Sequence, residues 1–75
     1  MPKFPVLTYQ QVIKKIRKVG FRFYRQCKGS HEMWVRDNDG KIAIVPNHPG
    51  KIIKRKTLKD IINATGLSVS AFIRL

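Results

Sequence analysis

The chain has 75 residues, of which sixteen are Lys or Arg and four are Asp or Glu, and its formal net charge is +12. This length predicts one domain over residues 1–75, and an apolar content of 43% supports a small core and argues against disorder. No apolar run approaches the roughly 18–20 residues of a membrane span, and the single cysteine, Cys27, excludes an intrachain disulfide. The start, MPKFPVLTYQ, lacks the continuous apolar stretch of a secretory signal, so we expect a cytoplasmic protein.

The positive charge predicts a polyanionic partner. It exceeds what solubility requires and destabilises the fold through self-repulsion. RNA, DNA, an acidic protein and an anionic membrane all have the complementary charge. The membrane is the weakest of these, because the basic helix described next has no exposed aromatic face to insert.

Residues 7–20, LTYQQVIKKIRKVG, predict an amphipathic helix. Thr8 can cap its N-terminus, with Gln11 completing a capping box, and Gly20 is placed to end it in the left-handed conformation. One face is apolar, as expected of a face packed on a core. That face contains Tyr9, Val12, Ile13, Ile16 and Val19.

Three segments rich in aromatic and β-branched residues, 21–27, 31–37 and 41–46, predict strands. DNDG at 37–40 supplies the turn of a hairpin, and Gly29-Ser30 marks the bend between the first two strands. If Met33 and Val35 face the helices, Trp34 faces outward, and a register error of one residue reverses this assignment.

Residues 46–56, PNHPGKIIKRK, predict a loop because they contain two prolines and a glycine. A second helix follows, with Thr57 as N-cap, Asp60 in the first turn and Gly66 at the end. Its apolar face contains Leu58, Ile61, Ile62 and Thr65. Ser68 can cap a further short helix at the C-terminus.

The resulting order, α-β-β-β-α, predicts an α+β fold with a three-stranded antiparallel sheet and its helices on one face. The other face would stay open to solvent or to a partner. We expect function at that open face and at the basic loop beside it.

His31 is the first candidate for chemistry. Gly29 and Ser30 leave room for a substrate near its ring, and an imidazole takes and gives protons at cellular pH. In RNA the 2′-hydroxyl is a nucleophile next to the phosphate, so cleavage needs proton transfer and positioning but no metal. The alternative is an ordinary surface or hydrogen-bonding histidine. Glu32 points to the opposite side of the strand and is a poor partner for His31.

No spacing of Cys and His suggests zinc, and four scattered acids disfavour a two-metal nuclease, so we expect no metal and no cofactor. His48 either packs in its loop or, if the loop folds back toward His31, supplies a second proton donor or a phosphate contact. Trp34 and Tyr24 either stack on unpaired bases or cover the sheet and join the core.

The basic cluster of residues 51–56 precedes a helix N-terminus, which also favours phosphate. The expected RNA contacts are Lys28, Gly29, Ser30, Trp34, Lys51, Lys54, Arg55 and Lys56, with His48 and Tyr24 as secondary candidates.

The fragments GFRFYRQCKGSHEMWV, VPNHPGK and TLKDIINATGLS, in this order and spacing, resemble the HicA toxins of toxin–antitoxin pairs. The resemblance extends from about Leu7 to Phe72, and its most specific piece is Gly29-Ser30-His31. Lys56 departs from it, because many members have glycine there.

The resemblance implies a fold similar to the double-stranded RNA-binding domain and a metal-independent endoribonuclease that cleaves mRNA. The family's catalytic histidine maps onto His31, and the usual partner is a HicB antitoxin that blocks the active site. An acidic surface on that partner would suit the charge of +12. Two alternatives remain: a non-catalytic module that recognises RNA by its duplex shape, and an adaptor that binds an acidic protein. Turnover separates the first of these from a nuclease.

Overall fold

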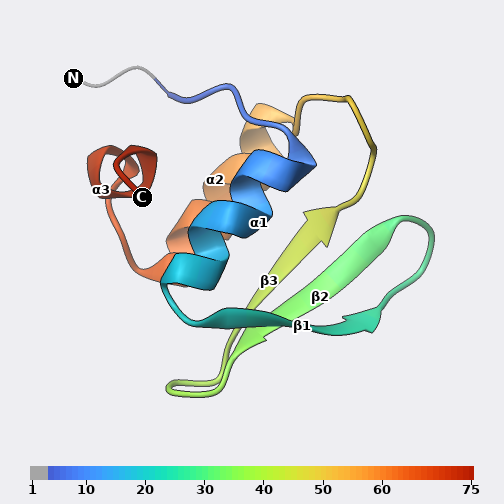
Figure 1. Ribbon diagram of the computed structural model, residues 1–75, viewed down its shortest axis with the longest axis horizontal. Helices are drawn as coiled ribbons and strands as arrows, with labels where there is room; N and C mark the ends of the chain where they lie inside the picture. Colours follow the sequence, from blue (N-terminus) through green and yellow to red (C-terminus); the bar gives the residue numbers. More distant parts are fainter. Residues whose placement is uncertain (1–3) are drawn as a thin grey trace.

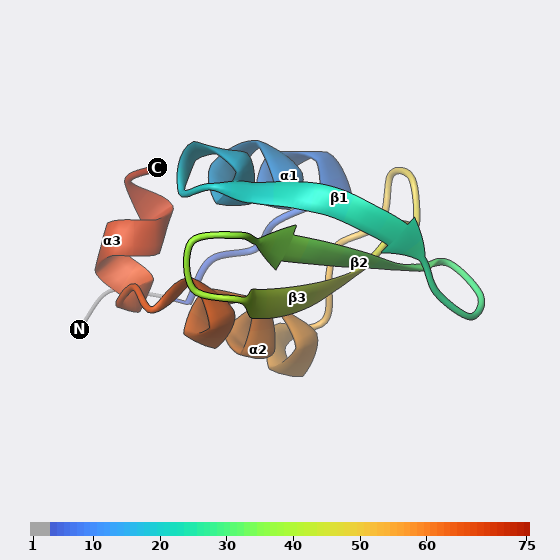
Figure 2. The ribbon, with the colours of Figure 1, turned by 90° about the horizontal axis from the view of Figure 1, so that it is seen from below.

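The computed structural model describes residues 4–75, so the first three residues of the domain predicted for 1–75 lie outside the described range. The elements, in chain order, are α1 (Tyr9–Lys18), β1 (Phe21–Gln26), β2 (His31–Arg36), β3 (Lys41–Pro46), α2 (Arg55–Thr65) and α3 (Val69–Ile73) (Figure 1). The three strands pair antiparallel in the order β1-β2-β3. Figure 2 shows α1 and α2 together behind the sheet, whose near face has no helix over it. This arrangement confirms the predicted α+β layout. No helix within residues 4–75 is long and apolar enough to cross a membrane.

Helix α1 begins and ends where the sequence predicts. The Thr8 N–H donates to Gln11 Oε1 at 2.9 Å and the Gln11 N–H to Thr8 Oγ1 at 3.5 Å, which completes the capping box. After the helix, Gly20 has φ +98°, and a Cβ there would lie 3.3 Å from Arg36 Cδ. Glycine is therefore required at this position both for its backbone conformation and for the close approach of the arginine.

Helix α2 begins three residues earlier than predicted. Lys54 is its N-cap and makes no side-chain capping bond within the described residues. Its carbonyl accepts the Leu58 N–H at 2.9 Å, so the backbone is already helical at Arg55. Thr57 therefore lies inside the first turn and Asp60 in the second, and both earlier assignments are wrong. The C-terminal signals are confirmed: Gly66 ends α2 with φ +79°, and Ser68 caps α3.

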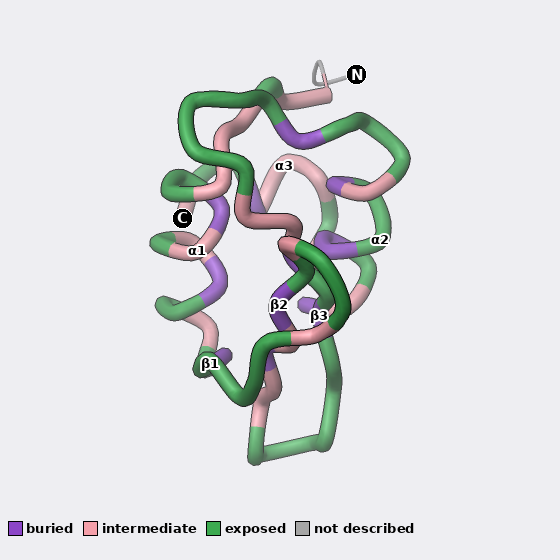
Figure 3. The backbone as a smooth tube through the Cα atoms, turned by 90° about the vertical axis from the view of Figure 1, so that its right-hand side faces the viewer, coloured by how far each residue is buried: buried purple, intermediate pink, exposed green. Residues whose placement is uncertain are grey.

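The core lies between the sheet and the helices, and the buried segments of α1 and α2 face the middle of the molecule (Figure 3). Trp34 belongs to it, with 1% of its surface exposed, so the prediction that Trp34 faces outward is wrong. Its cross-strand partners are Phe23 on β1 and Ala43 on β3. Met33 and Val35 lie on the open face instead. Burying the largest apolar side chain of β2 removes more apolar surface from water than the reverse register would.

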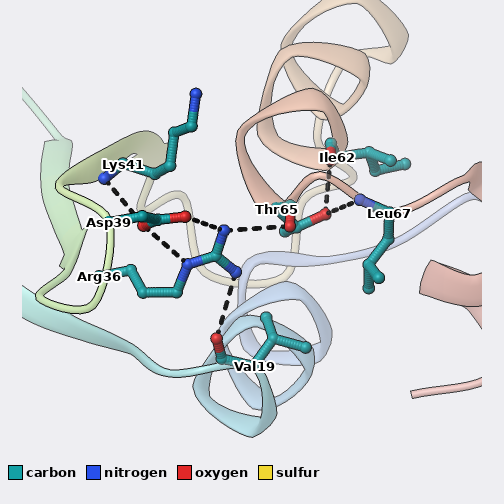
Figure 4. A network of polar contacts seen from close by, with 7 residues as sticks. All are labelled: Val19, Arg36, Asp39, Lys41, Ile62, Thr65 and Leu67. Carbon is teal, nitrogen blue, oxygen red and sulfur yellow. Dashed lines mark hydrogen bonds and ion pairs between the residues drawn. The ribbon is translucent and has the colours of Figure 1, made fainter.

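Arg36 joins the ends of two helices at the other end of β2 (Figure 4). It donates to Val19 O at 3.3 Å and to Thr65 O at 3.2 Å, and it pairs with Asp39 through two bonds of 3.0 and 2.8 Å. A positive group is favourable at a helix C-terminus, where carbonyl oxygens lack partners. The guanidinium also holds the pKa of the Asp39 carboxyl below its usual range, chiefly through the hydrogen bond. This contact fixes α1 and α2 relative to the sheet.

Candidate active site

His31 is the first residue of β2 and is exposed. Its Nδ1 lies 3.2 Å from Lys28 O. A carbonyl oxygen only accepts, so this contact is made by Nδ1–H, and in the neutral ring it leaves the lone pair on Nε2. The structure thus presents an accessible imidazole in the tautomer that suits a base acting through Nε2.

The turn before His31 is held by the backbone and by one amide side chain. The Cys27 N–H donates to His31 O at 2.8 Å, and Gln26 Nε2 donates to Gly29 O at 3.0 Å and to His31 O at 3.1 Å. Gly29 has φ +66°, and nothing lies within 4 Å of where its Cβ would be. Glycine is needed here for the turn, and the space beside it stays open, as the sequence suggested.

The loop of residues 46–54 folds back onto this turn. The Asn47 N–H donates to Ser30 O at 2.9 Å, and His48 Nε2 lies 3.0 Å from Ser30 Oγ. The structure therefore meets the condition that the sequence left open for His48. Both histidines line one pocket of about 420 Å³.

Cationic side chains line the same pocket. Lys51 and Lys54 border it together with Thr57, which the sequence suggested only as a helix cap. A neighbouring pocket of about 320 Å³ is also lined by His31 and Thr57, and it continues to Ile44 and Asp60. The two pockets thus meet at His31 in a groove that runs from the basic loop toward the β3 edge. A groove with two ammonium groups beside an imidazole suits a phosphodiester chain.

Other predicted contacts lie elsewhere. The Arg55 guanidinium sits 4.9 Å from the centre of the Phe4 ring, toward the N-terminal segment. Lys56 is exposed on α2 but lines neither of the two pockets, and Lys28 contributes its carbonyl to His31 from an exposed turn. Trp34 is buried in the core, so its ring is not available to stack on a base.

Tyr24 is the accessible member of the two aromatic candidates. It is 55% exposed, and the Arg22 guanidinium lies 5.9 Å from the centre of its ring. It lies on β1, at the irregular pairing between Phe23 and Arg25, and lines neither pocket at His31. Any stacking by Tyr24 would therefore involve a more distant part of a bound strand.

A buried polar network behind the site was not predicted. Glu32 Oε1 accepts from Tyr9 OH at 2.6 Å and from Trp34 Nε1 at 3.1 Å, and Oε2 accepts from Asn47 Nδ2 at 3.0 Å. Burial, then the bond to Glu32 and its charge, raise the pKa of Tyr9 to about 12. Through Asn47, the network anchors the loop that contains His48. The alternation of β2 placed Glu32 opposite His31, but two of its partners, Tyr9 and Asn47, lie too far away in sequence to be predicted from a pattern.

Within residues 4–75, no group of three or more His, Cys, Asp or Glu side chains is close enough to hold a metal ion. Comparison with curated proteins finds no match. A family model described as the HicA toxin of bacterial toxin–antitoxin systems matches residues 9–67, which cover most of the chain and all of the residues around His31. The chain therefore belongs to the HicA toxin family.

Proposed function

We propose that this toxin is a metal-independent endoribonuclease that cleaves mRNA, with His31 as its general base. The observation that carries the proposal is an exposed imidazole, in the tautomer set by Lys28 O, that shares a pocket with Lys51 and Lys54. Proton transfer by a well-placed base contributes roughly 10²–10⁴-fold to the rate. Loss of mRNA then arrests growth.

In the proposed reaction, His31 Nε2 takes the proton of the 2′-hydroxyl, and the 2′-oxygen bonds to phosphorus. The bond from phosphorus to the 5′-oxygen breaks with its electron pair staying on that oxygen, which leaves a 2′,3′-cyclic phosphate and, once the oxygen has gained a proton, a 5′-hydroxyl end. Lys51 and Lys54 stabilise the negative charge that develops on the phosphoryl oxygens. Lys28, Gly29 and Ser30 would contact the RNA beside the ring, and Arg55 and Lys56 would bind the chain further along.

The same pocket is where we propose that a HicB-type antitoxin acts. An antitoxin that covers His31 would exclude RNA from the imidazole and from the two lysines. The net charge of +12 favours an acidic surface on that partner and rapid association with it.

The first test is His31→Ala, assayed for cleavage of RNA. We expect cleavage to fall by at least about 100-fold, with circular dichroism and RNA binding close to those of the wild type, because the exposed ring contributes little to the core. Lys59→Ala is the matched control, since Lys59 is exposed on α2 and lines neither pocket. Cleavage by His31→Ala at the wild-type rate would disprove the assignment, and loss of wild-type activity in EDTA would point to a metal.

A non-catalytic RNA-binding module is the second candidate, because the α-β-β-β-α layout expected of a double-stranded RNA-binding module is also the layout of this chain. Wild-type protein that binds RNA and leaves it intact would favour this candidate.

A further inference from the structure

We propose that His48 is a second catalytic residue, the general acid that protonates the leaving 5′-oxygen, and that Ser30 orients it. This inference rests on the proposed ribonuclease function and extends it from one histidine to a pair. Nothing in the reaction as described above supplies a proton to the leaving group, and an alkoxide is a poor leaving group without one.

The first observation is that both rings line the same pocket. The pocket of about 420 Å³ lies between the loop and α2, and it is bordered by His31, His48, Lys51 and Lys54. A phosphodiester held by the two lysines therefore has an imidazole from β2 and another from the loop within the same enclosure. Cleavage by a 2′-hydroxyl needs one group to remove a proton and another to deliver one, on opposite sides of phosphorus.

The second observation is that one nitrogen of His48 is already engaged. Its Nε2 lies 3.0 Å from Ser30 Oγ. When Nε2–H donates to that oxygen, Nδ1 is the nitrogen that gains and loses the transferable proton. Ser30 then plays toward His48 the role that Lys28 O plays toward His31, since each fixes the ring through the nitrogen that does not react.

The third observation is that hydrogen bonds fix the backbone on both sides of His48, to β2 and the turn before it on one side and within the loop itself on the other. Asn47 donates through its backbone to Ser30 O at 2.9 Å and through its side chain to the buried Glu32 at 3.0 Å. After it, the Lys51 N–H donates to His48 O at 3.1 Å. An exposed loop histidine with no role in catalysis would need none of these contacts. They make Asn47 and Glu32 positioning residues for the second imidazole.

In the completed reaction, His31 Nε2 accepts the 2′-hydroxyl proton as the bond between the 2′-oxygen and phosphorus forms. As the bond from phosphorus to the 5′-oxygen breaks, its electron pair stays on the oxygen, which takes the proton from Nδ1 of protonated His48. His31 leaves the step protonated and His48 neutral. Exchange with water restores both rings.

The experiment compares two forms of one short RNA, after cleavage by the wild type has mapped the linkage that is cut. In one form the bridging 5′-atom is oxygen, and in the other it is sulfur, whose thiolate leaves without protonation. We expect His48→Ala to slow cleavage of the oxygen linkage by about 100-fold or more and that of the sulfur linkage by less than about tenfold. His31→Ala should slow both, because the 2′-hydroxyl proton must be removed in either case. Ser30→Ala should resemble His48→Ala with a smaller loss.

Pro49→Ala is the control within the loop, and His48→Gln replaces His48→Ala if the alanine variant fails to fold. If His48→Ala slows cleavage of both linkages equally, His48 binds RNA or supports the structure. If His48→Ala cleaves the oxygen linkage at the wild-type rate, His48 has no part in catalysis. Either result overturns the proposal. If His31→Ala is inactive while His48→Ala behaves in one of these ways, the ribonuclease function survives and only the second role fails. If the wild type cleaves neither RNA, both proposals fail together.

Discussion

Glu32 is the residue whose chemistry determines much of the site's rigidity. It is 7% exposed, and its two oxygens receive hydrogen bonds from three donors, on Tyr9, Trp34 and Asn47. A carboxylate only accepts, so it matches this set of donors without leaving any of them unsatisfied. An amide in its place would point an N–H₂ group at one of them. Burying the charged group is tolerable because all of these bonds form in the folded state.

Tyr9 makes this network visible in the pH dependence of stability. Its phenol has a usual pKa near 10 and a pKa of about 12 in the folded protein. Between these values the unfolded chain loses the proton that the folded chain keeps, so the free energy of unfolding falls as the pH rises from about 10 to about 12. The largest slope from one such group is about 1.4 kcal/mol per pH unit. Below pH 10 the contribution is constant.

We therefore expect Tyr9→Phe to be less stable than the wild type by about 1 kcal/mol at pH 8 and the difference to shrink at pH 11. Urea unfolding of both proteins at several pH values measures this, and lysine titration is common to both, so it cancels. Tyr24→Phe is the matched loss of an exposed phenol. The network assignment would be contradicted if the difference in unfolding free energy between Tyr9→Phe and the wild type were the same at pH 8 and pH 11. It would also be contradicted if this difference shrank equally for Tyr9→Phe and Tyr24→Phe.

At the scale of elements, two arginine–carboxylate pairs of similar geometry have different roles. Arg22 bonds Asp37 at 2.7 and 3.0 Å, and the two side chains are 54% and 69% exposed. Arg36 bonds Asp39 as closely but is 14% exposed and also reaches the last turns of α1 and α2. Exposed pairs contribute little to stability, whereas a guanidinium that satisfies helix carbonyls contributes several bonds at once.

Arg36→Gln should lower the free energy of unfolding by about 2 kcal/mol, and Arg22→Gln should lower it far less, because water screens that exposed pair. Thermal or urea unfolding of the two variants beside the wild type measures the difference. Equal losses would mean that the contacts with α1 and α2 add nothing to the ion pair.

What the sequence predicts of these elements follows from the range of the interactions. Thr8, Gly20, Gly66 and Ser68 act within a few residues of themselves, and all four end or begin helices as expected. The orientation of Trp34 depends on burial across three strands. The alternation of side chains along β2 alone does not say which face is buried, and the prediction chose the wrong face.

The same reasoning applies to the candidate site. Gly29-Ser30-His31 is contiguous, so a pattern singles it out. The contact between Ser30 and His48 joins residues eighteen positions apart, and the bond from Asn47 to Glu32 joins residues fifteen apart. Such distances depend on the folded loop and have no local signature. The folded position of the loop decides which of its basic residues share the pocket with His31.

For the whole molecule, charge and groove together predict how RNA binding responds to salt. Sixteen basic residues give the molecule a general attraction for RNA, but Lys51 and Lys54 alone among the cluster of residues 51–56 line the pocket at His31. Each phosphate contact releases counterions, so the binding constant falls linearly with salt on logarithmic axes. With about six contacts, affinity should fall roughly 10³-fold between 50 and 200 mM salt. Measurement with His31→Ala avoids cleavage of the ligand.

The position of the groove is tested by removing two charges at a time. The double variant Lys51→Ala, Lys54→Ala should make the slope of the logarithmic plot shallower by the amount that corresponds to about two lost phosphate contacts. Lys14→Ala with Lys18→Ala lowers the net charge equally but changes only exposed positions of α1, which lines neither pocket at His31. This second pair should therefore weaken binding slightly and leave the slope near that of the parent. Equal slopes for the two double variants would mean that RNA is held by the overall charge and has no fixed path past His31.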